Sequence, residues 1–454
     1  MDFQGLSTDG QIAQRAPPAR KAAVGLFVCA VIVLANGLAH PHVLQGLWRY
    51  DDPQILDFVI HQPIFESLYQ PQVWRALGLP FYTPFHTLSY ALDYRLFGAQ
   101  PAGFYAHHFI SSSLLVALIA TVLLRGVPPL LQAACGVALV FSLPIYVMTE
   151  QLMLRQYLEG GVFAVLAYAL FIARSPLARA LSVVCYAGAI LCKEIYIPLP
   201  LLLLALPPGM RSSRGRWLTL AGYAAVLAAY LAMRVYMLGG MGGYQARLLP
   251  SLAEFSQFWD ASPRWVFGAG LGGLLGLAAG ILLVTTGLHQ RILKRWLTLA
   301  WAVAAVLPIL PVIHSMPVDI GAAYFVPHRY VFAAFLDLFV GSAVTCAVMC
   351  KRPSGAPSGQ LPGLAALLTG LAFVTLVTAT VLPGKDRQCL MQLNHYSEQV
   401  YGEMAAGRFK LNAAPAELRD YFALMERHIA NIQRHGDRFA NLAAPQVSPP
   451  PPRA

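Results

Sequence analysis

Residues 20–53 read RKAAVGLFVCAVIVLANGLAHPHVLQGLWRYDDP and contain, in order, two basic residues, an apolar run and an acidic pair. The apolar run, 22–40, is long enough to cross a hydrocarbon core about 30 Å thick, which takes about 20 residues of helix. Basic residues before such a run indicate that its start faces the cytoplasm. The run is too long and too poor in a cleavage site for a removable signal peptide, so we expect it to remain as an anchor.

The whole chain has the composition of a membrane protein. Apolar residues make up 57% of its 454 residues and charged residues 12%, whereas soluble domains have about 45–50% and about 25%. This balance excludes a soluble enzyme, a disulfide scaffold, a disordered chain and a nucleic-acid-binding domain. The 7 cysteines contain no CxxC pair and lie mostly in or beside apolar runs, so neither a disulfide framework nor a zinc site is indicated.

Further apolar runs predict an all-α polytopic membrane protein with about eleven spans. We expect the spans near residues 22–40, 104–124, 128–147, 157–173, 177–191, 195–207, 217–238, 266–288, 296–314, 331–350 and 361–382. Only Lys193-Glu194 separates the short fifth and sixth spans. The sequence is therefore compatible either with two separate helices or with one broken or re-entrant element at this position.

The positions of the basic residues define the orientation of these spans. If the N-terminus is cytoplasmic, the inner loops are rich in Arg and Lys and contain only the acids Asp2 and Asp9. The net charge of +11 therefore reflects membrane topology rather than a nucleic-acid partner. The chain then divides into a cytoplasmic segment, 1–21, a transmembrane module, 22–382, and an outer tail, 383–454. The longest outer loop is 41–103.

The tail contains two predicted features. Its apolar residues recur at helical spacing and predict an amphipathic helix, lying on the membrane or on the first loop, that includes Leu418, Phe422, Met425, Ile429 and Ile432. Four consecutive prolines near the end of the sequence predict disorder over 448–454.

Asp51 and Asp52 follow the first span on its outer side, within the motif WRYDDP. Adjacent carboxylates at a membrane interface suit two tasks: one acts as a general base on an acceptor hydroxyl, and the other orients it or binds a cation. A solvated turn is the alternative interpretation, because Asp-Asp-Pro is common in loops.

Three charged clusters lie at membrane borders on the same side as the acidic pair. They are Glu150 with Arg155 and Glu159, Lys193 with Glu194, and His328-Arg329-Tyr330. A charge inside hydrocarbon costs about 2.5–3.5 kcal/mol or more, so such residues usually face a cavity or one another. Snorkelling at helix ends is the alternative for each cluster. Cations around two carboxylates match a transfer reaction with a phosphate leaving group, in which the cations bind the phosphate.

Histidines and one aspartate are weaker candidates. His107 and His108 begin the second span, and His86 lies in the loop before it. A bare pair of histidines is a weak metal signal, so satisfied histidines at the membrane interface are the favoured interpretation. Asp337, two turns into the tenth span, is expected to pair with a cation from another helix.

The order of these motifs resembles the GT-C superfamily of integral-membrane glycosyltransferases, including protein O-mannosyltransferases and aminoarabinose transferases. The acidic pair lies in the first outer loop, where that superfamily has its catalytic aspartate. Residues 82–84 and 88–98, YTP and LSYALDYRLFG, are similar to the family run RPL…LSFALDYxLFG. Residues 154–158, 192–194 and 328–332, LRQYL, CKE and HRYVF, are similar to the motifs GRxDLL, SKE…P and ERYLY.

The resemblance implies a GT-C-like bundle whose first periplasmic loop carries short interfacial helices. It also implies a location in the bacterial inner membrane with the active site facing the periplasm. The implied activity is that of an inverting hexosyl- or pentosyltransferase, which moves a monosaccharide from a polyprenyl-phosphate carrier. The acceptor would be a surface glycan, lipid A or a protein such as pilin. No nucleic acid takes part.

The resemblance also implies roles for individual residues. Asp51 would be the general base, and Asp52 would orient it or help to hold a divalent cation, Mg or Mn, if one is used. The implied ligands of the donor phosphate are Arg329, Lys193 and Arg155. The residues expected to position the acceptor or support the site are Glu150, Glu194, Tyr330, His107 and His108.

Three rival functions remain open. An O-antigen polymerase or ligase would have a long late periplasmic loop with paired arginines, whereas residues 315–330 are few and contain one arginine. A transporter of lipid-linked glycans predicts charges at mid-membrane and repeated halves, whereas the unusual charges here lie at the outer border. A catalytically dead scaffold would tolerate the loss of both Asp51 and Asp52.

Overall fold

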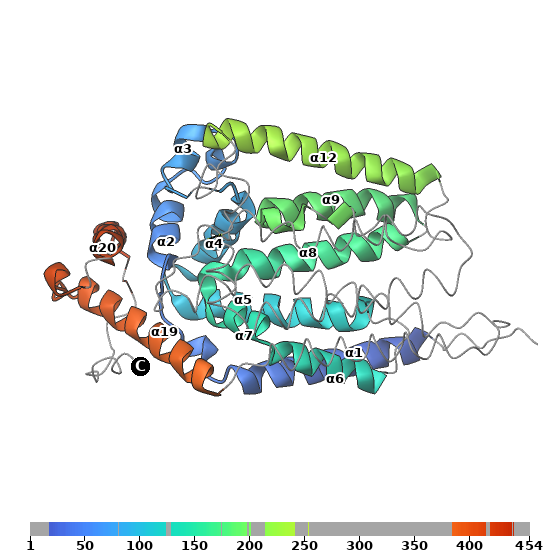
Figure 1. The fold of residues 1–454 in the computed structure, drawn as a ribbon, viewed down its shortest axis with the longest axis horizontal. Helices are drawn as coiled ribbons and strands as arrows, with labels where there is room; N and C mark the ends of the chain where they lie inside the picture. The colour runs from blue at the N-terminus through green and yellow to red at the C-terminus, as the bar shows by residue number, and fades with distance from the viewer. Residues whose placement is uncertain are drawn as a thin grey trace, which may run out of the picture.

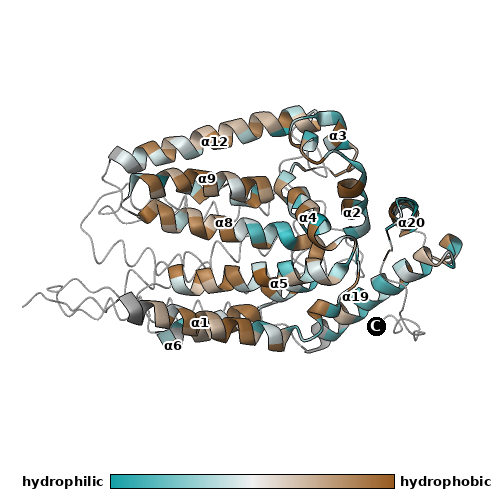
Figure 2. Ribbon diagram, turned by 180° about the vertical axis from the view of Figure 1, so that it is seen from behind, coloured by the Kyte–Doolittle hydropathy of each residue, from teal (hydrophilic) through white to brown (hydrophobic). Residues whose placement is uncertain are grey.

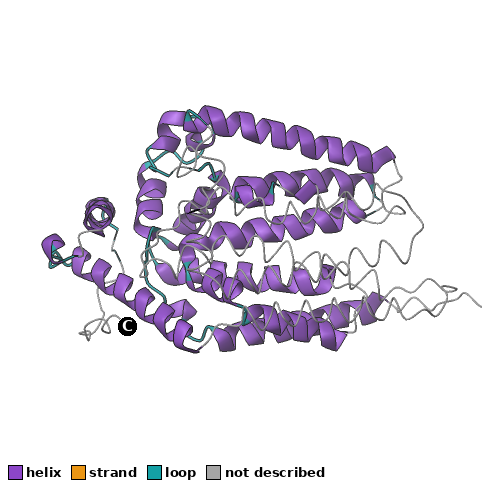
Figure 3. Ribbon diagram, in the orientation of Figure 1, coloured by secondary structure: helices purple, strands orange, loops and turns teal. Residues whose placement is uncertain are grey.

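The computed structural model describes residues 18–79, 81–123, 129–173, 175–197, 199–200, 214–240, 253, 384–414, 418–437 and 439. Within this part of the chain every regular element is a helix, as the sequence predicts (Figure 3). The eighth to eleventh expected spans, most of the sixth, and Asp337 lie outside the described residues.

Several described helices run side by side as a bundle (Figure 1). Three are long and apolar enough to cross a membrane: α1 (Pro18–Ala39), α5 (Pro101–Leu118), which continues as a π-helical segment to Leu123, and α12 (Arg214–Leu238). Between them lie α8 (Arg155–Ile172) and α9 (Pro176–Cys192). The all-helical prediction is therefore confirmed for the described residues, three of the helices suit membrane spans by length and composition, and the total of about eleven spans stays a prediction.

The expected span 128–147 is not one helix. It is divided into α6 (Pro129–Val140) and α7 (Leu143–Glu150). Pro144 lacks the N–H that a continuous helix needs, and its ring would clash with the preceding turn, so the helix breaks before it. At the end of α6 the Leu139 carbonyl accepts hydrogen bonds of 2.6 Å from the Ser142 hydroxyl and 3.0 Å from the Ser142 N–H.

The first loop folds into short helices at one end of the bundle, as expected for its interfacial helices. They are α2 (Asp52–His61), α3 (Pro71–Arg75) and α4 (Pro84–Phe97). Each has a proline in its first turn, where a backbone N–H would have no acceptor within the helix, so the N–H that proline lacks is not needed. In Figure 1, α2 runs across the bundle axis. We call this the capped end.

Two tail helices complete the capped end. They are α19 (Gly384–Ala405) and α20 (Arg419–Arg434), together the tail hairpin. Figure 2 shows more hydrophilic residues on them than on the bundle helices. α20 buries four of the five apolar residues that predicted an amphipathic helix, namely Phe422, Met425, Ile429 and Ile432, whereas Leu418 precedes the helix and is exposed.

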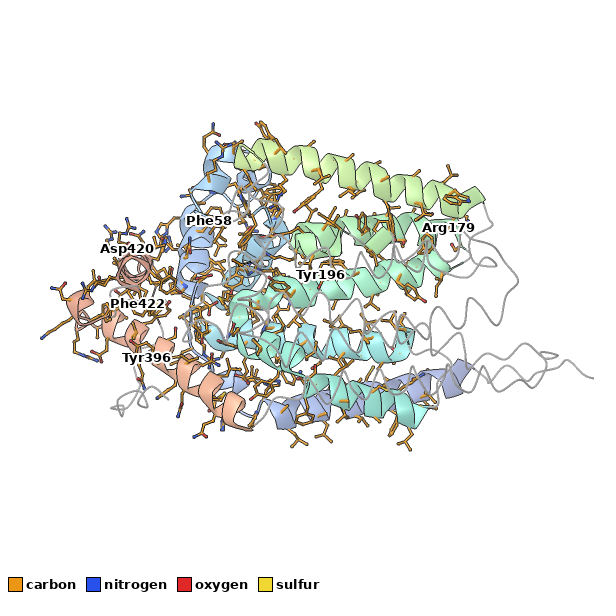
Figure 4. All side chains as sticks on the ribbon, viewed as in Figure 1. Phe58, Arg179, Tyr196, Tyr396, Asp420 and Phe422 are labelled. Atoms are coloured by element: carbon orange, nitrogen blue, oxygen red, sulfur yellow. The ribbon has the colours of Figure 1, made fainter. Side chains whose placement is uncertain are left out.

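α20 lies on the first loop, one of the two positions open from the sequence. Oδ2 of Asp57 on α2 lies 2.7 Å from Nδ1 of His428 and accepts a hydrogen bond of 3.0 Å from the Asn431 amide. Figure 4 shows Phe422 of α20 and Phe58 of α2 on these two neighbouring helices.

Arg179 marks the other end of the bundle. It lies at the start of α9, beside Gly215 at the start of α12, and far from Phe58 of α2 in Figure 4. An arginine predicted to be cytoplasmic and the acidic pair therefore lie at opposite ends of the bundle. Which end faces which compartment stays a prediction.

A close contact between α8 and the segment after α9 fixes one part of the capped end. The Tyr196 hydroxyl donates to the Tyr157 carbonyl, and its ring occupies the space where Gly160 has no Cβ. Any larger residue at Gly160 would displace this ring. Because Tyr196 belongs to the short helix Glu194–Tyr196, the contact also holds the preceding residue, Lys193.

Met425→Ala is expected to weaken docking of the tail hairpin by about 2–5 kcal/mol, because it leaves a cavity under α20. Limited proteolysis of the purified full-length protein should then cut the segment 384–437 faster than in the unaltered protein. Arg427→Ala, which changes an exposed residue of the same helix, is the matched control. Equal cleavage of the two variants would contradict this docking.

Candidate active site

A cavity of about 400 Å³, a volume that includes its open side, lies at the capped end. Its wall is built from the start of α2, the segment before α4, α4 itself, the start of α8 and the residue after α9. The polar wall residues are Asp51, His86, Gln156 and Lys193. The structure thus places the predicted base and one predicted phosphate ligand on the same cavity.

Asp51 immediately precedes α2, and a strained residue comes before it. Tyr50 has φ +48°, in the left-handed region that non-glycine residues rarely adopt. Such strain costs of order 1–3 kcal/mol and persists only where the surroundings hold it. Oδ1 of Asp51 accepts a hydrogen bond of 3.3 Å from the Tyr421 hydroxyl of α20. A tail residue therefore contacts the predicted base directly.

Asp52 has a different environment from its neighbour. Its side chain is fully buried, and its two oxygens accept hydrogen bonds of 2.9 Å from the Arg49 N–H and the Tyr90 hydroxyl. Burial raises the pKa of Asp52 to about 7, although these two hydrogen bonds act in the opposite direction. Asp51 thus lines the cavity, while Asp52 is enclosed by protein. The division of roles between a base and an orienting residue stays a prediction.

The described residues at the acidic pair do not by themselves complete a site for a divalent cation. Both Asp52 oxygens already accept protein hydrogen bonds. In the part of the chain that the structure describes, no three His, Cys, Asp or Glu side chains converge as metal ligands would. Mg and similar hard cations need several converging oxygen ligands.

Lys193 lies in the cavity wall between a carboxylate and two aromatic rings. Its Nζ is 3.6 Å from Oε1 of Glu194 and 3.9 Å from the centre of the Phe81 ring, with the Tyr157 ring centre at 5.4 Å. Cations are attracted to the faces of aromatic rings, more strongly where water is excluded. Glu194 is thus the carboxylate partner of Lys193, and its role in positioning an acceptor or supporting the site stays a prediction.

His86 and Gln156, two residues of the same wall, contain hydrogen-bonding atoms that the described protein does not use. His86 Nε2 and Gln156 Oε1 are buried and have no hydrogen-bond partner among the described residues. Burial lowers the pKa of His86 well below its usual value, and the charges of Arg155 and Lys193 lower it further, so the ring is neutral. Buried polar atoms without partners are costly, and in a cavity wall a ligand can satisfy them.

Sequence reasoning missed these two residues. It treated His86 only as a neighbour of the histidine pair, and it gave Gln156 no role. Gln156 stands beside Arg155 within the motif LRQYL, which drew attention to the charged residue instead.

The structure does not bring Arg155 to the cavity wall. Its buried guanidinium forms an ion pair with Asp93, donates a hydrogen bond of 2.7 Å to the Phe104 carbonyl, and lies 4.9 Å from the centre of the Tyr90 ring. His107 joins this cluster, with Nδ1 2.8 Å from Asp93. Arg155 therefore ties α8 to α4 and α5, and both of its Nη atoms are hydrogen-bonded within the protein.

Glu150 also lies away from the cavity wall. Its Oε1 is 2.5 Å from Nδ1 of His40, and its Oε2 is 3.7 Å from Nη1 of Arg49. His108 Nε2 is 2.7 Å from the Met148 carbonyl, so each histidine of the pair has a protein partner. These residues support the helices of the capped end. Arg329 and Tyr330 lie outside the described residues.

Comparisons of the chain with protein family models, curated proteins and solved structures found no match. The functional interpretation therefore rests on the motifs and on the geometry of the cavity.

The raised pKa of Asp52 predicts how stability depends on pH. Because the folded pKa of about 7 exceeds the unfolded value of about 3.9, the stabilisation is complete below the unfolded pKa and is lost as pH rises through the folded pKa. Unfolding of the purified protein should therefore occur at lower temperatures as pH rises from 5 to 8. Asp52→Asn should remove most of this slope, and an unchanged slope would contradict the buried, raised carboxyl.

Arg155→Leu should destabilise the protein by about 3–5 kcal/mol, because it leaves the buried Asp93 carboxylate without its partner. The double variant Arg155→Leu with Asp93→Leu should recover much of this loss, as measured by thermal unfolding in detergent. If Arg155 instead served only a ligand, the single variant would unfold like the unaltered protein.

Proposed function

We propose that the chain is an inverting glycosyltransferase that takes a monosaccharide from a polyprenyl-phosphate carrier. The observation that carries the proposal is the shared cavity at one end of a membrane bundle. A carboxylate and a lysine line it together with two unsatisfied polar groups, at Asp51, Lys193, His86 and Gln156. A general base and a cation in one enclosed site are what transfer from a phosphate ester needs.

In the proposed reaction an acceptor hydroxyl attacks the anomeric carbon of the sugar while Asp51 takes the hydroxyl proton. The bond between the anomeric carbon and the phosphate oxygen breaks, and polyprenyl phosphate leaves with the bonding electrons. Lys193 stabilises the negative charge on the leaving phosphate. Attack opposite the leaving group inverts the configuration at the anomeric carbon.

The other wall residues suit a substrate that is both polar and apolar. Apolar side chains such as Ile55, Leu79 and Met153 line the cavity beside the polar ones. Sugar hydroxyls can satisfy His86 Nε2 and Gln156 Oε1, since buried polar atoms favour hydrogen-bonding ligands. Arg329 is the second proposed phosphate ligand. Arg155 is proposed as a structural support, because its guanidinium is already engaged.

We place the protein in a bacterial inner membrane with the capped end in the periplasm. The inner loops expected from the sequence carry the basic excess, and Arg179 lies at the opposite end of the bundle from Phe58 of α2, the helix that Asp51 precedes (Figure 4). A surface glycan, lipid A or a protein then supplies the acceptor hydroxyl.

The test compares surface glycoconjugates by mass spectrometry in a strain that lacks the gene and in strains that carry variants at matched protein levels. Deletion and Asp51→Asn should each remove one sugar mass from a defined glycan, lipid or protein. Lys193→Ala should reduce that product about tenfold or more, through lost stabilisation of the leaving group. Glu403→Gln, at an exposed acid of α19, is the control and should retain the product.

Two outcomes would count against the proposal. If deletion removes the sugar while Asp51→Asn retains it, the assigned base is wrong and a transport or scaffold role is favoured. If deletion changes no glycan, the glycosyltransferase function itself is wrong.

A further inference from the structure

The tail hairpin holds the residues around Asp51 from outside the bundle. The Tyr421 hydroxyl of α20 donates 3.3 Å to Asp51 Oδ1 and lies 3.1 Å from the Tyr401 hydroxyl of α19. Tyr401 in turn donates 2.5 Å to the carbonyl of Tyr50. Two tail tyrosines therefore contact both the carboxylate and the peptide group that precedes it.

α19 makes a second set of contacts with the same segment. The Tyr50 N–H donates 3.1 Å to the Ser397 hydroxyl, and the Tyr50 hydroxyl donates 2.9 Å to the Asn394 side chain. Glu398 accepts from the Leu47 N–H at 3.2 Å. Through these bonds the N–H, carbonyl and side chain of Tyr50 are all fixed by one helix.

These contacts explain how a strained backbone persists beside the proposed base. Tyr50 adopts φ +48°, a conformation that is unfavourable for a non-glycine residue and persists only where neighbouring contacts offset its cost. The N–H, the hydroxyl and the carbonyl of Tyr50 are each hydrogen-bonded to a residue of α19. A change of this φ would turn the chain just before Asp51 and carry its carboxylate away from the cavity.

We infer that the tail hairpin is part of the active centre, with Tyr421 and Tyr401 as positioning residues that hold the Asp51 carboxylate at the cavity. This inference deepens the proposed function and rests on it. The two tyrosines act through Asp51 and neither is in the cavity wall.

The position of Tyr421 depends on the docking of α20. The apolar face of that helix and the contacts of His428 and Asn431 with Asp57 hold it on α2, the helix that Asp51 precedes. Tyr421 lies in the first turn of α20 and is half-buried, so its hydroxyl has a restricted set of positions. Docking therefore sets the distance between the hydroxyl and the carboxylate.

The first experiment measures sugar transfer in membranes that contain the full-length protein, with an extracted polyprenyl-phosphate sugar as donor. Tyr421→Phe should lower kcat about tenfold, the effect of one lost hydrogen bond to a charged group, with the KM for donor unchanged. Tyr401→Phe should act in the same direction. Tyr396→Phe, at a half-buried tyrosine of α19 (Figure 4), is the matched control and should leave both constants unchanged.

The second experiment needs no enzymatic activity. A water-soluble carbodiimide and a glycine ester label accessible carboxyl groups of the purified protein, and peptide mass spectrometry measures each site. Tyr421→Phe should change labelling of Asp51 several-fold, while labelling of the exposed Asp420 stays the same. Thermal unfolding of each variant separates this effect from loss of the fold.

The two experiments distinguish the two proposals. Unchanged kcat and unchanged Asp51 labelling in Tyr421→Phe would overturn the positioning role. Changed labelling in a protein that transfers no sugar would overturn the proposed function and leave the contact with Asp51 in place.

Discussion

The capped end depends on one buried cation, Arg49. Its Nη2 lies 2.6 Å from Oε1 of Glu398 on α19, and its Nη1 donates 2.7 Å to the carbonyl of Glu150 at the end of α7. Its own N–H donates to Asp52. A buried charge that loses its partner costs several kcal/mol, so these three elements keep a fixed relation to one another. The acidic pair takes its position from this junction.

The junction also explains why two adjacent aspartates behave differently. The Asp52 carboxylate accepts hydrogen bonds from the Arg49 N–H and the Tyr90 hydroxyl, which hold it inside the protein at the start of α2. Asp51, one residue earlier, remains at the cavity wall. When two neighbouring titratable groups have different surroundings, they can take different roles in a reaction.

Local sequence patterns predicted the parts of the fold that local physics controls. Apolar length identified α1, α5 and α12 as spans, and helical spacing identified α20. The placement of charged residues along the sequence predicted that Asp51 and Lys193 lie on the same side, and both line the cavity at the capped end. The break in the third expected span is also a local feature, because Pro144 lacks the N–H of a continuous helix. Hydrophobicity alone predicts one helix there.

Partnerships between distant residues could not be predicted in this way. Tyr421 and Asp51 are separated by 370 positions, and no spacing rule joins them. The role of Arg155 shows the converse problem, since a cation at a helix end has the same sequence signature whether it faces a ligand or a buried partner such as Asp93. Only three-dimensional placement distinguishes the two.

The docking of the tail hairpin on the first loop has a consequence for biosynthesis. The proposed base emerges from the ribosome soon after the first span, whereas Tyr401 and Tyr421 follow only after the rest of the bundle has been translated. A nascent chain that is still being inserted therefore carries the acidic pair without the contacts that hold it. A chain truncated before residue 384 would therefore retain the preceding spans and lack the two tyrosines that hold Asp51 and Tyr50.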